Sequence, residues 1–109
     1  GKSFNVIYAE NDDMAKGAVA ALDKANIPHG VGKDVIVMGF DCNKWALEEL
    51  LNQNWNYDGQ CNPFQASYID DIIKKIENGE TISEKTIIMD EKGFDATTIT
   101  QEDLDNYGI

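Results

Sequence analysis

The chain contains no arginine, and this absence narrows the ligands and partners that it can bind. Nine lysines stand against 20 acidic residues, so the formal net charge is -11. A strongly negative chain repels the phosphate backbone of nucleic acids and disfavours anionic membrane surfaces. The planar arginine fork is also the usual partner of phosphate and carboxylate groups. We therefore expect no nucleic-acid partner, and a ligand that is neutral and rich in hydroxyl groups.

Cysteine and histidine are also scarce, which argues against a metal site. Cys42 and Cys61 match no zinc-ligand spacing, and the one histidine, His29, lies in a Pro-Gly loop without a second ligand nearby. We expect His29 to be an exposed loop residue and the protein to use no cofactor.

Long apolar runs are missing as well. None approaches the roughly 20 residues of a membrane span, and the N-terminus has neither an initiator Met nor a signal-peptide h-region. The chain therefore looks processed or truncated. With 109 residues, of which 42% are hydrophobic, it fits at most one compact domain with a core.

The hydrophobic pattern predicts alternating strands and helices. The first helix shows Met14, Ala18, Leu22 and Ala25 at helical spacing, and the run over residues 35–40 is continuous enough for a strand covered on both faces. Right-handed crossovers then predict an α/β fold with a doubly wound, mostly parallel sheet. The expected strands are 4–9, 35–40, 57–61 and 86–89, and the expected helices are 12–25, 44–51 and 64–78.

Two helix-end signals lie in the second half of the chain. Gly79 is placed where a C′ glycine ends the helix over 64–78, whose apolar stripe is Ile69, Ile72, Ile73 and Ile76. The sequence from Thr100 to Asp103 has the form of a capping box, which predicts a short final helical turn.

Polar side chains follow three consecutive predicted strands. The stretch VIYAENDDMAKGA runs from a strand into four polar residues, Asp41 follows the second strand, and Gln60-Cys61-Asn62 ends the third. Ligands of open α/β sheets bind beyond the carboxyl ends of the strands. Asn11 offers a donor and an acceptor and Asp41 offers two acceptor oxygens, a combination that suits adjacent sugar hydroxyls.

Helix capping is the competing explanation for these acidic residues. Asp12 and Asp13 fall in the first turn of a predicted helix, where acidic groups favour the helix dipole, and either Asn11 or Asp12 can be the cap. Asp41 also precedes a helix. Trp45 and Trp55 could stack on a sugar, but core packing explains both without a ligand.

Three segments resemble a known family. YAENDDMAKGAVAAL, KDVIVMGFDCNKWALEEL and QCNPFQ are similar to the second half of the type I sugar-binding proteins of ABC importers, the ribose- and galactose-binding group. The CNP turn and the ending DEKGFDATTITQEDLDNYG most resemble the galactofuranose-type subgroup.

The resemblance implies a function and a set of ligand-binding residues. Asn11 and Asp41 match family positions that bind the sugar, and a third position falls at Gln60 or Cys61, where the pattern departs from the family. The implied protein is not an enzyme: it holds a pentose or hexose between two lobes and delivers it to a membrane permease. It works outside the cytoplasm, in the periplasm or lipid-anchored at the outer face of the cell membrane.

The resemblance also implies that residues 1–109 are a fragment of the C-terminal lobe. Residues 64–85 would then pack on an absent first lobe and leave the isoleucine stripe exposed. The missing opening strands would also leave one edge of the sheet unpaired. Because two copies can bury both surfaces against each other, we expect the fragment to dimerise.

An extracytoplasmic location would allow the two thiols to form a disulfide bond. Cys42 and Cys61 follow two strands that are expected to be neighbours, and a disulfide needs Cα atoms within roughly 7 Å. The alternative is two small buried side chains.

Other classes remain open on the residues alone. The sensor domain of a lactose-repressor-type regulator shares this fold. A phospho-receiver domain would need another strand between its acidic pair, here ending at Asp13, and its acceptor aspartate, here Asp41. A hydrolase would need a base close to a nucleophile, and His29 lies at the other end of its helix.

Overall fold

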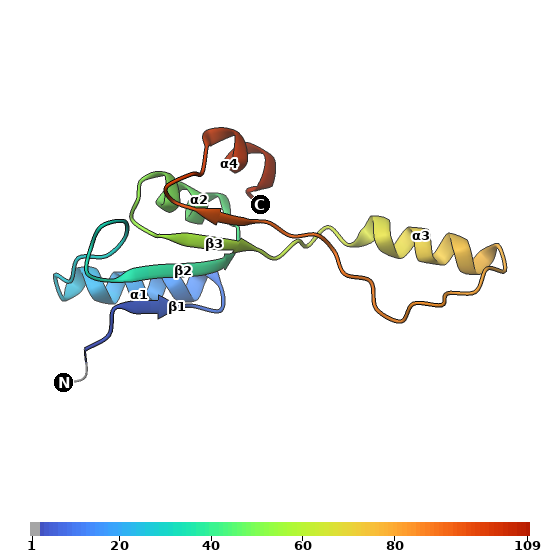
Figure 1. Ribbon diagram of the computed structural model, residues 1–109, viewed down its shortest axis with the longest axis horizontal. Coiled ribbons are helices and arrows are strands. Elements are labelled where there is room, and N and C mark those ends of the chain that lie inside the picture. The colour runs from blue at the N-terminus through green and yellow to red at the C-terminus, as the bar shows by residue number, and fades with distance from the viewer. Residues whose placement is uncertain (1–2) are drawn as a thin grey trace. The chain divides into compact units, whose positions relative to one another are not determined.

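Four strands form one sheet in the order β1-β2-β3-β4. The computed structural model describes residues 3–109 and is drawn in Figure 1. Residues 3–61 and 92–109 make one unit, which holds the whole sheet, and residues 62–91 make a second unit. The elements are β1 (Val6–Tyr8), α1 (Asp12–Lys24), β2 (Ile36–Asp41), α2 (Lys44–Leu51), β3 (Tyr57–Gln60), α3 (Ala66–Glu77), β4 (Gly93–Asp95) and α4 (Gln101–Tyr107).

Pairing within the sheet confirms the α/β fold class. β1 pairs with β2 and β2 with β3 in parallel, whereas β4 pairs with β3 in the antiparallel direction. Tyr8 lies opposite Met38, and Asp41 lies opposite Gln60. The carboxyl ends of β1, β2 and β3 therefore meet at the same edge of the sheet.

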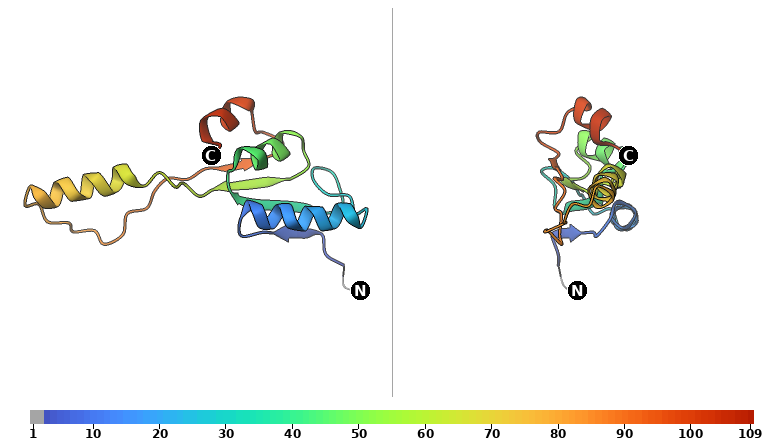
Figure 2. Two further views of the ribbon diagram at one scale, coloured as in Figure 1. Left: turned by 180° about the vertical axis from the view of Figure 1, so that it is seen from behind. Right: turned by 90° about the vertical axis from the view of Figure 1, so that its right-hand side faces the viewer.

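Both crossover helices of this unit cover the same face of the sheet. Strands laid down in the order β1, β2, β3 with right-handed crossovers place every connecting helix on one side, and α1 and α2 lie in front of the strands in the left view of Figure 2. The continuous apolar run predicted a strand covered on both faces. Within this unit, helices cover β2 on one face only. Val37 is buried toward the helices, whereas Ile36 on the other face is 42% exposed.

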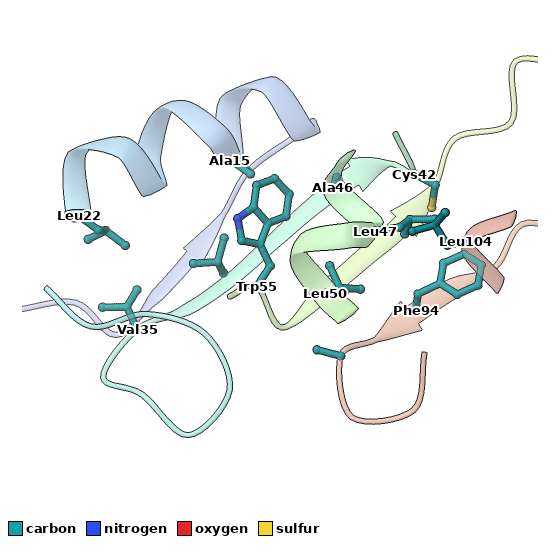
Figure 3. Packing of buried hydrophobic residues seen from close by; sticks show 13 residues of the cluster. Ala15, Leu22, Val35, Cys42, Ala46, Leu47, Leu50, Trp55, Phe94 and Leu104 are labelled. Atoms are coloured by element: carbon teal, nitrogen blue, oxygen red, sulfur yellow. The ribbon is translucent and has the colours of Figure 1, made fainter. Parts of the chain in front are cut away.

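The core fills the space between the helices and the sheet. Trp55 is 1% exposed and lies between α1 and α2, near Ala15 in Figure 3. Its ring makes an edge-to-face contact with Trp45 at 5.9 Å between centroids. The explanation of both tryptophans by core packing is therefore supported. The other buried hydrophobic residues are Ala9, Ala15, Leu22, Val35, Val37, Cys42, Ala46, Leu47, Leu50, Phe94, Ala96 and Leu104.

The buried face of α1 differs from the predicted one. Leu22 is buried as expected, but Met14 is 56% exposed and Ala15 takes the position against the core. The apolar spacing alone could not find this face, because a buried aspartate, Asp12, forms part of it.

The strand predicted over residues 86–89 is wrong. Those residues form no strand, and the fourth strand is β4, where Phe94 is buried and its ring lies 5.5 Å from that of Tyr107 on α4. β4 forms because it pairs with β3 and buries Phe94. The β-branched residues within 86–89 have no strand to pair with, so they form no strand.

The second unit contains α3. Ile69, Ile73 and Ile76 are exposed on this helix, which has no buried residue. Gly79 has a φ of 75°, which confirms the predicted left-handed C′ glycine. The apolar stripe therefore exists and is uncovered within residues 62–91.

The chain end forms the predicted helix. Thr100 accepts from the Asp103 backbone N–H, and the Asp103 carboxylate accepts from the Thr100 backbone, so the capping box is complete. α4 lies beside α2, and the backbone N–H of Ile109 donates to the Cys42 carbonyl. Over residues 3–109, no helix has the length and apolar character needed to cross a membrane.

Gly39 is predicted to be essential for the packing of the sheet against α1. A Cβ on Gly39 would lie 2.6 Å from Asp12 Oδ1 and 2.9 Å from the Trp55 ring. Gly39→Ala should therefore lower the free energy of unfolding by about 1–3 kcal/mol, the usual cost of overpacking, as measured by denaturant titration of tryptophan fluorescence.

Gly17→Ala is the matched control. Nothing lies within 4 Å of the Cβ position at Gly17, which is in the interior of α1. This change should raise the free energy of unfolding by roughly 0.5–1 kcal/mol. Equal effects of the two substitutions would contradict the packing argument.

Candidate functional site

The candidate site is the edge of the sheet where β1, β2 and β3 end. Asn11 follows β1 and begins α1, Asp41 is the last residue of β2, and Gln60 is the last residue of β3. Asp41 and Gln60 are cross-strand partners. Three of the predicted ligand-binding residues therefore lie at one edge of the sheet.

Asn11 caps α1 and still has a polar group to offer. Its Oδ1 accepts the backbone N–H of Met14 at 2.8 Å, so Asn11 and not Asp12 is the cap. Its amide nitrogen has no partner within residues 3–109, and the residue is half-buried. Asn11 can therefore donate a hydrogen bond to a ligand while it caps the helix.

Asp41 is not a helix cap. The cap residue of α2 is Asn43, and no side-chain hydrogen bond caps this helix. Asp41 has a φ of 126° and Cys42 a φ of 63°, two consecutive non-glycine residues at positive φ. Such strained backbone is costly and concentrates at functional sites. Capping therefore does not explain Asp41, and its conformation favours a functional role.

Gln60 and Cys61 occupy the third strand end. The Gln60 backbone N–H donates to the Lys92 carbonyl, and Gln60 Oε1 accepts the Lys92 backbone N–H at 3.2 Å. These bonds hold Gln60 against Lys92, which directly precedes β4. Cys61 is exposed and is the last residue of the first of the two segments that make up this unit.

The structure does not contain the disulfide considered between Cys42 and Cys61. Both thiols are free. Cys42 is buried, and its thiol donates to Asp58 Oδ1 over 3.9 Å, whereas Cys61 is exposed. The left-handed backbone at Cys42 directs its thiol into the core, so the proximity of the two strands does not bring the sulfurs together.

Two buried carboxyl groups lie directly beneath this edge. Asp12 and Asp58 are both 0% exposed. Asp12 Oδ2 accepts two hydrogen bonds from Asn43, from the backbone N–H at 2.9 Å and from the side-chain amide at 3.0 Å. Asp12 Oδ1 and Asp58 Oδ2 have no other donor among residues 3–109. A proton held between the two carboxyl groups satisfies both oxygens.

Burial shifts the protonation of this pair. Burial, together with the neighbouring Asp12 carboxyl, raises the pKa of Asp58 to about 8. Burial also raises the pKa of Asp12, although the hydrogen bonds from Asp58 and Asn43 oppose the shift. Asp58 therefore carries the shared proton at neutral pH and donates it to Asp12. The pKa of the Cys42 thiol is raised by burial and by the nearby carboxylates, so this cysteine is not a nucleophile.

Sequence patterns did not identify Asp58. Its flanking residues Tyr57 and Gly59 only indicate a short polar strand. The available signal was an aspartate in the middle of a strand otherwise free of charge, because a charged residue at a buried strand position needs a partner. For Asp12 the sequence predicts a place in the first turn of a helix, and it does not predict a buried pair.

His29 and the two tryptophans do not belong to the strand-end edge. His29 is not freely exposed as predicted: its side chain is 11% exposed, Nδ1 bonds the Asn54 carbonyl and Nε2 bonds Asp23. No group of three or more metal-ligating residues occurs within residues 3–109. A cavity of about 360 Å³ is lined by Lys16, Trp45 and Trp55 among others, and includes none of the predicted ligand-binding residues. Asn11, Asp41 and Gln60 at the strand-end edge are each half-buried.

Comparison with known proteins identifies homologues of this chain. It is 34% identical over 100 residues to the fructose import binding protein FruE of Bifidobacterium longum, which covers 92% of this chain and 29% of that protein. It is 28% identical over 85 residues to the galactofuranose-binding protein YtfQ of Escherichia coli, which covers 78% of this chain and 26% of that protein. The chain thus spans less than a third of the length of these relatives. No family model matches it.

Solved structures show the same fold. A galactofuranose-binding protein superimposes with a TM-score of 0.79 at 25% identity, over 94% of this chain and 34% of that one. A Mycobacterium smegmatis protein in complex with β-D-fucofuranose gives a TM-score of 0.73 at 28% identity, over 87% and 30% of the two chains. The homologues are sugar-import binding proteins, and the fold is that of type I periplasmic binding proteins.

The buried pair predicts an unusual dependence of stability on pH. The pKa of Asp58 is about 8 in the folded chain and near its ordinary 3.8 in the unfolded chain. Between pH 3.8 and about 8, the folded state holds a proton on Asp58 that unfolding releases. The free energy of unfolding therefore falls as pH rises, by at most about 1.4 kcal/mol per pH unit from this group. The contribution of protonated Asp58 to stability is complete below about pH 4 and is lost as pH rises through about 8. Asp58→Asn should remove this slope in urea titrations followed by tryptophan fluorescence.

Asp34→Asn is the control for the change in net charge. Asp34 is exposed, so this variant should keep the slope of the parent. Parallel pH profiles for the parent and Asp58→Asn would show that the pair does not hold an extra proton.

Proposed function

Since this chain is a homologue of the sugar-import binding proteins and has the type I periplasmic-binding fold, we propose that it forms one wall of a monosaccharide site in a two-lobed protein. This protein is not an enzyme. It binds a neutral pentose or hexose between its lobes and delivers it to the permease of an ABC importer.

The observation that carries the proposal is the clustering of polar groups at the edge where three parallel strands end. Asn11 offers an amide donor, Asp41 offers carboxylate acceptors, and Gln60 lies opposite Asp41. Adjacent sugar hydroxyls each donate and accept hydrogen bonds, so they need both kinds of partner. The absence of arginine agrees with an uncharged ligand.

Part of the chain is proposed to serve the other lobe. Residues 64–85 would pack there, because the exposed isoleucines of α3 need a cover that residues 62–91 do not provide. Residues 3–61 and 92–109 would then remain as the part that contributes ligand contacts. An importer protein of this kind works outside the cytoplasm, free in the periplasm or held by a lipid at the outer face of the membrane.

Asp41 is predicted to provide the dominant ligand contact. In the full-length protein that carries this sequence, Asp41→Ala should weaken binding of the preferred sugar by about 2–5 kcal/mol, or roughly 30-fold to several thousand-fold. The loss arises because a desolvated charged acceptor is removed from sugar hydroxyls. Isothermal titration calorimetry with D-fructose, D-ribose, D-galactose, D-allose and L-arabinose measures the effect.

Asp34→Asn and circular dichroism are the controls for this experiment. The exposed Asp34 should be replaceable without any change of affinity. If Asp41→Ala folds normally and binds as tightly as the parent, Asp41 is not a ligand residue. If the full-length parent binds none of the sugars, the proposed function is wrong.

The 109-residue chain alone is predicted to self-associate. Val6, Tyr8 and Ile36 are exposed on the uncovered face of the sheet, and β1 is an edge strand of the described sheet. Burial between two copies removes this apolar surface from water. Light scattering at increasing protein concentration should show a dimer, and a monodisperse monomer at millimolar concentration would contradict it.

A further inference from the structure

We propose that Asp58 is a positioning residue for sugar binding: paired with Asp12, it holds the backbone turn after β2 in the conformation that presents Asp41 to the ligand. The inference rests on the proposed function for its ligand, and on the geometry beneath the strand-end edge for its mechanism. Asp58 does not touch the sugar.

The Asp12 carboxyl fills the space above Gly39. Gly39 and Asp58 are cross-strand partners in the register of β2 and β3. A Cβ on Gly39 would lie 2.6 Å from Asp12 Oδ1, so the Asp12 carboxyl occupies the room that the missing side chain leaves. This places the Asp12 carboxyl on the same face of the sheet as its neighbour Asp58, with both fully buried.

The buried pair accepts hydrogen bonds from the turn after β2. Asp12 accepts both the backbone and the side-chain N–H of Asn43, while Asp58 accepts from Cys42. Residues 42 and 43 are thereby held from two sides, by the start of α1 and by the middle of β3. The two strained residues, Asp41 and Cys42, lie at this point. Strained backbone persists only where surrounding contacts determine it, and the buried pair supplies such contacts.

The other proposed ligand residues lie close to the pair in the sequence. Asn11 directly precedes Asp12, and Gln60 lies two residues beyond Asp58 on the same side of β3. One proton-linked pair therefore joins the three elements that carry the proposed ligand residues. The alignment of these residues depends on a contact that lies below the binding surface.

The surroundings of the pair determine what happens when it loses its proton. The titratable groups that face it are Asp41 and Cys42 from the end of β2, and none of them is basic. With one proton the pair is a hydrogen bond between an acid and a carboxylate. When that proton is lost, two buried like charges repel each other, and within residues 3–109 no cationic group is among those that shift their pKa values. The turn that they hold should then loosen.

The test is the pH profile of sugar affinity in the full-length protein. Calorimetry between pH 6 and 10, with the most tightly bound of the five sugars named above, should show affinity falling about tenfold as Asp58 ionises around pH 8, a typical coupling between two sites. Asp58→Asn keeps the shape and can still donate to Asp12, so its affinity should stay level across this range. Asp13→Asn removes an exposed charge beside the pair and should keep the profile of the parent.

Other outcomes of this experiment overturn the proposal. A purely structural role would change the free energy of unfolding with pH but leave the affinity of the folded protein constant. A level profile for the parent, or the same fall in Asp58→Asn as in the parent, therefore shows that Asp58 does not position the site.

A second measurement separates this inference from the proposed function. In NMR spectra of the sugar-free full-length protein, the backbone amide signals of Asp41, Cys42 and Asn43 should move together with the titration of the Asp58 carboxyl. In Asp58→Asn they should stay fixed over the same range. If no sugar binds but the signals move, the function is wrong and the coupling stands. If the signals of the parent do not move, the coupling itself is refuted.

Discussion

The hydrogen bond between the buried carboxyl groups of Asp12 and Asp58 is the contact on which the candidate site depends. It joins the beginning of α1 to the middle of β3, and through Asn43 it reaches the start of α2. A carboxyl pair in a core is stable only when it holds a proton, because two buried charges without a cation are too costly. The edge of the sheet is therefore supported by a group whose ordinary pKa would leave it charged, and burial keeps it neutral.

The glycine at position 39 is required by the burial of the Asp12 carboxyl beside the sheet. Gly39 has no side chain because Asp12 and the Trp55 ring occupy the space where a Cβ would be. The polar contacts and the aromatic core therefore meet at one glycine. A change in the core at this position also changes the polar layer that carries the candidate ligand residues.

The homologues and the strand-end edge agree with the proposed function. Proteins that bind sugars between two lobes need two walls, and this chain provides polar groups at one edge of its sheet. The uncovered sheet face and the exposed isoleucines of α3 are surfaces that need further partners. These features agree with a chain that spans less than a third of the length of its relatives.

Much of the fold and part of the site follow from local chemistry. The helices α1, α2 and α3, the capping box at Thr100 and the glycine at position 79 were predictable, since periodicity and caps act over a few residues. The placement of Asn11, Asp41 and Gln60 at one edge was also predictable, because parallel strands must end together.

Only the tertiary structure decided the rest. It replaced the predicted strand over 86–89 by β4, whose pairing with β3 and burial of Phe94 depend on residues more than 30 positions away. It also decided that Cys42 and Cys61 form no disulfide bond, because the Cys42 thiol is buried in the core and Cys61 is exposed. It also paired Asp12 with Asp58, which lie 46 positions apart and have no local sequence signal in common. The sequence by itself determined the alternation of strands and helices, and long-range packing determined which acidic residues are charged, which are buried and which can face a ligand.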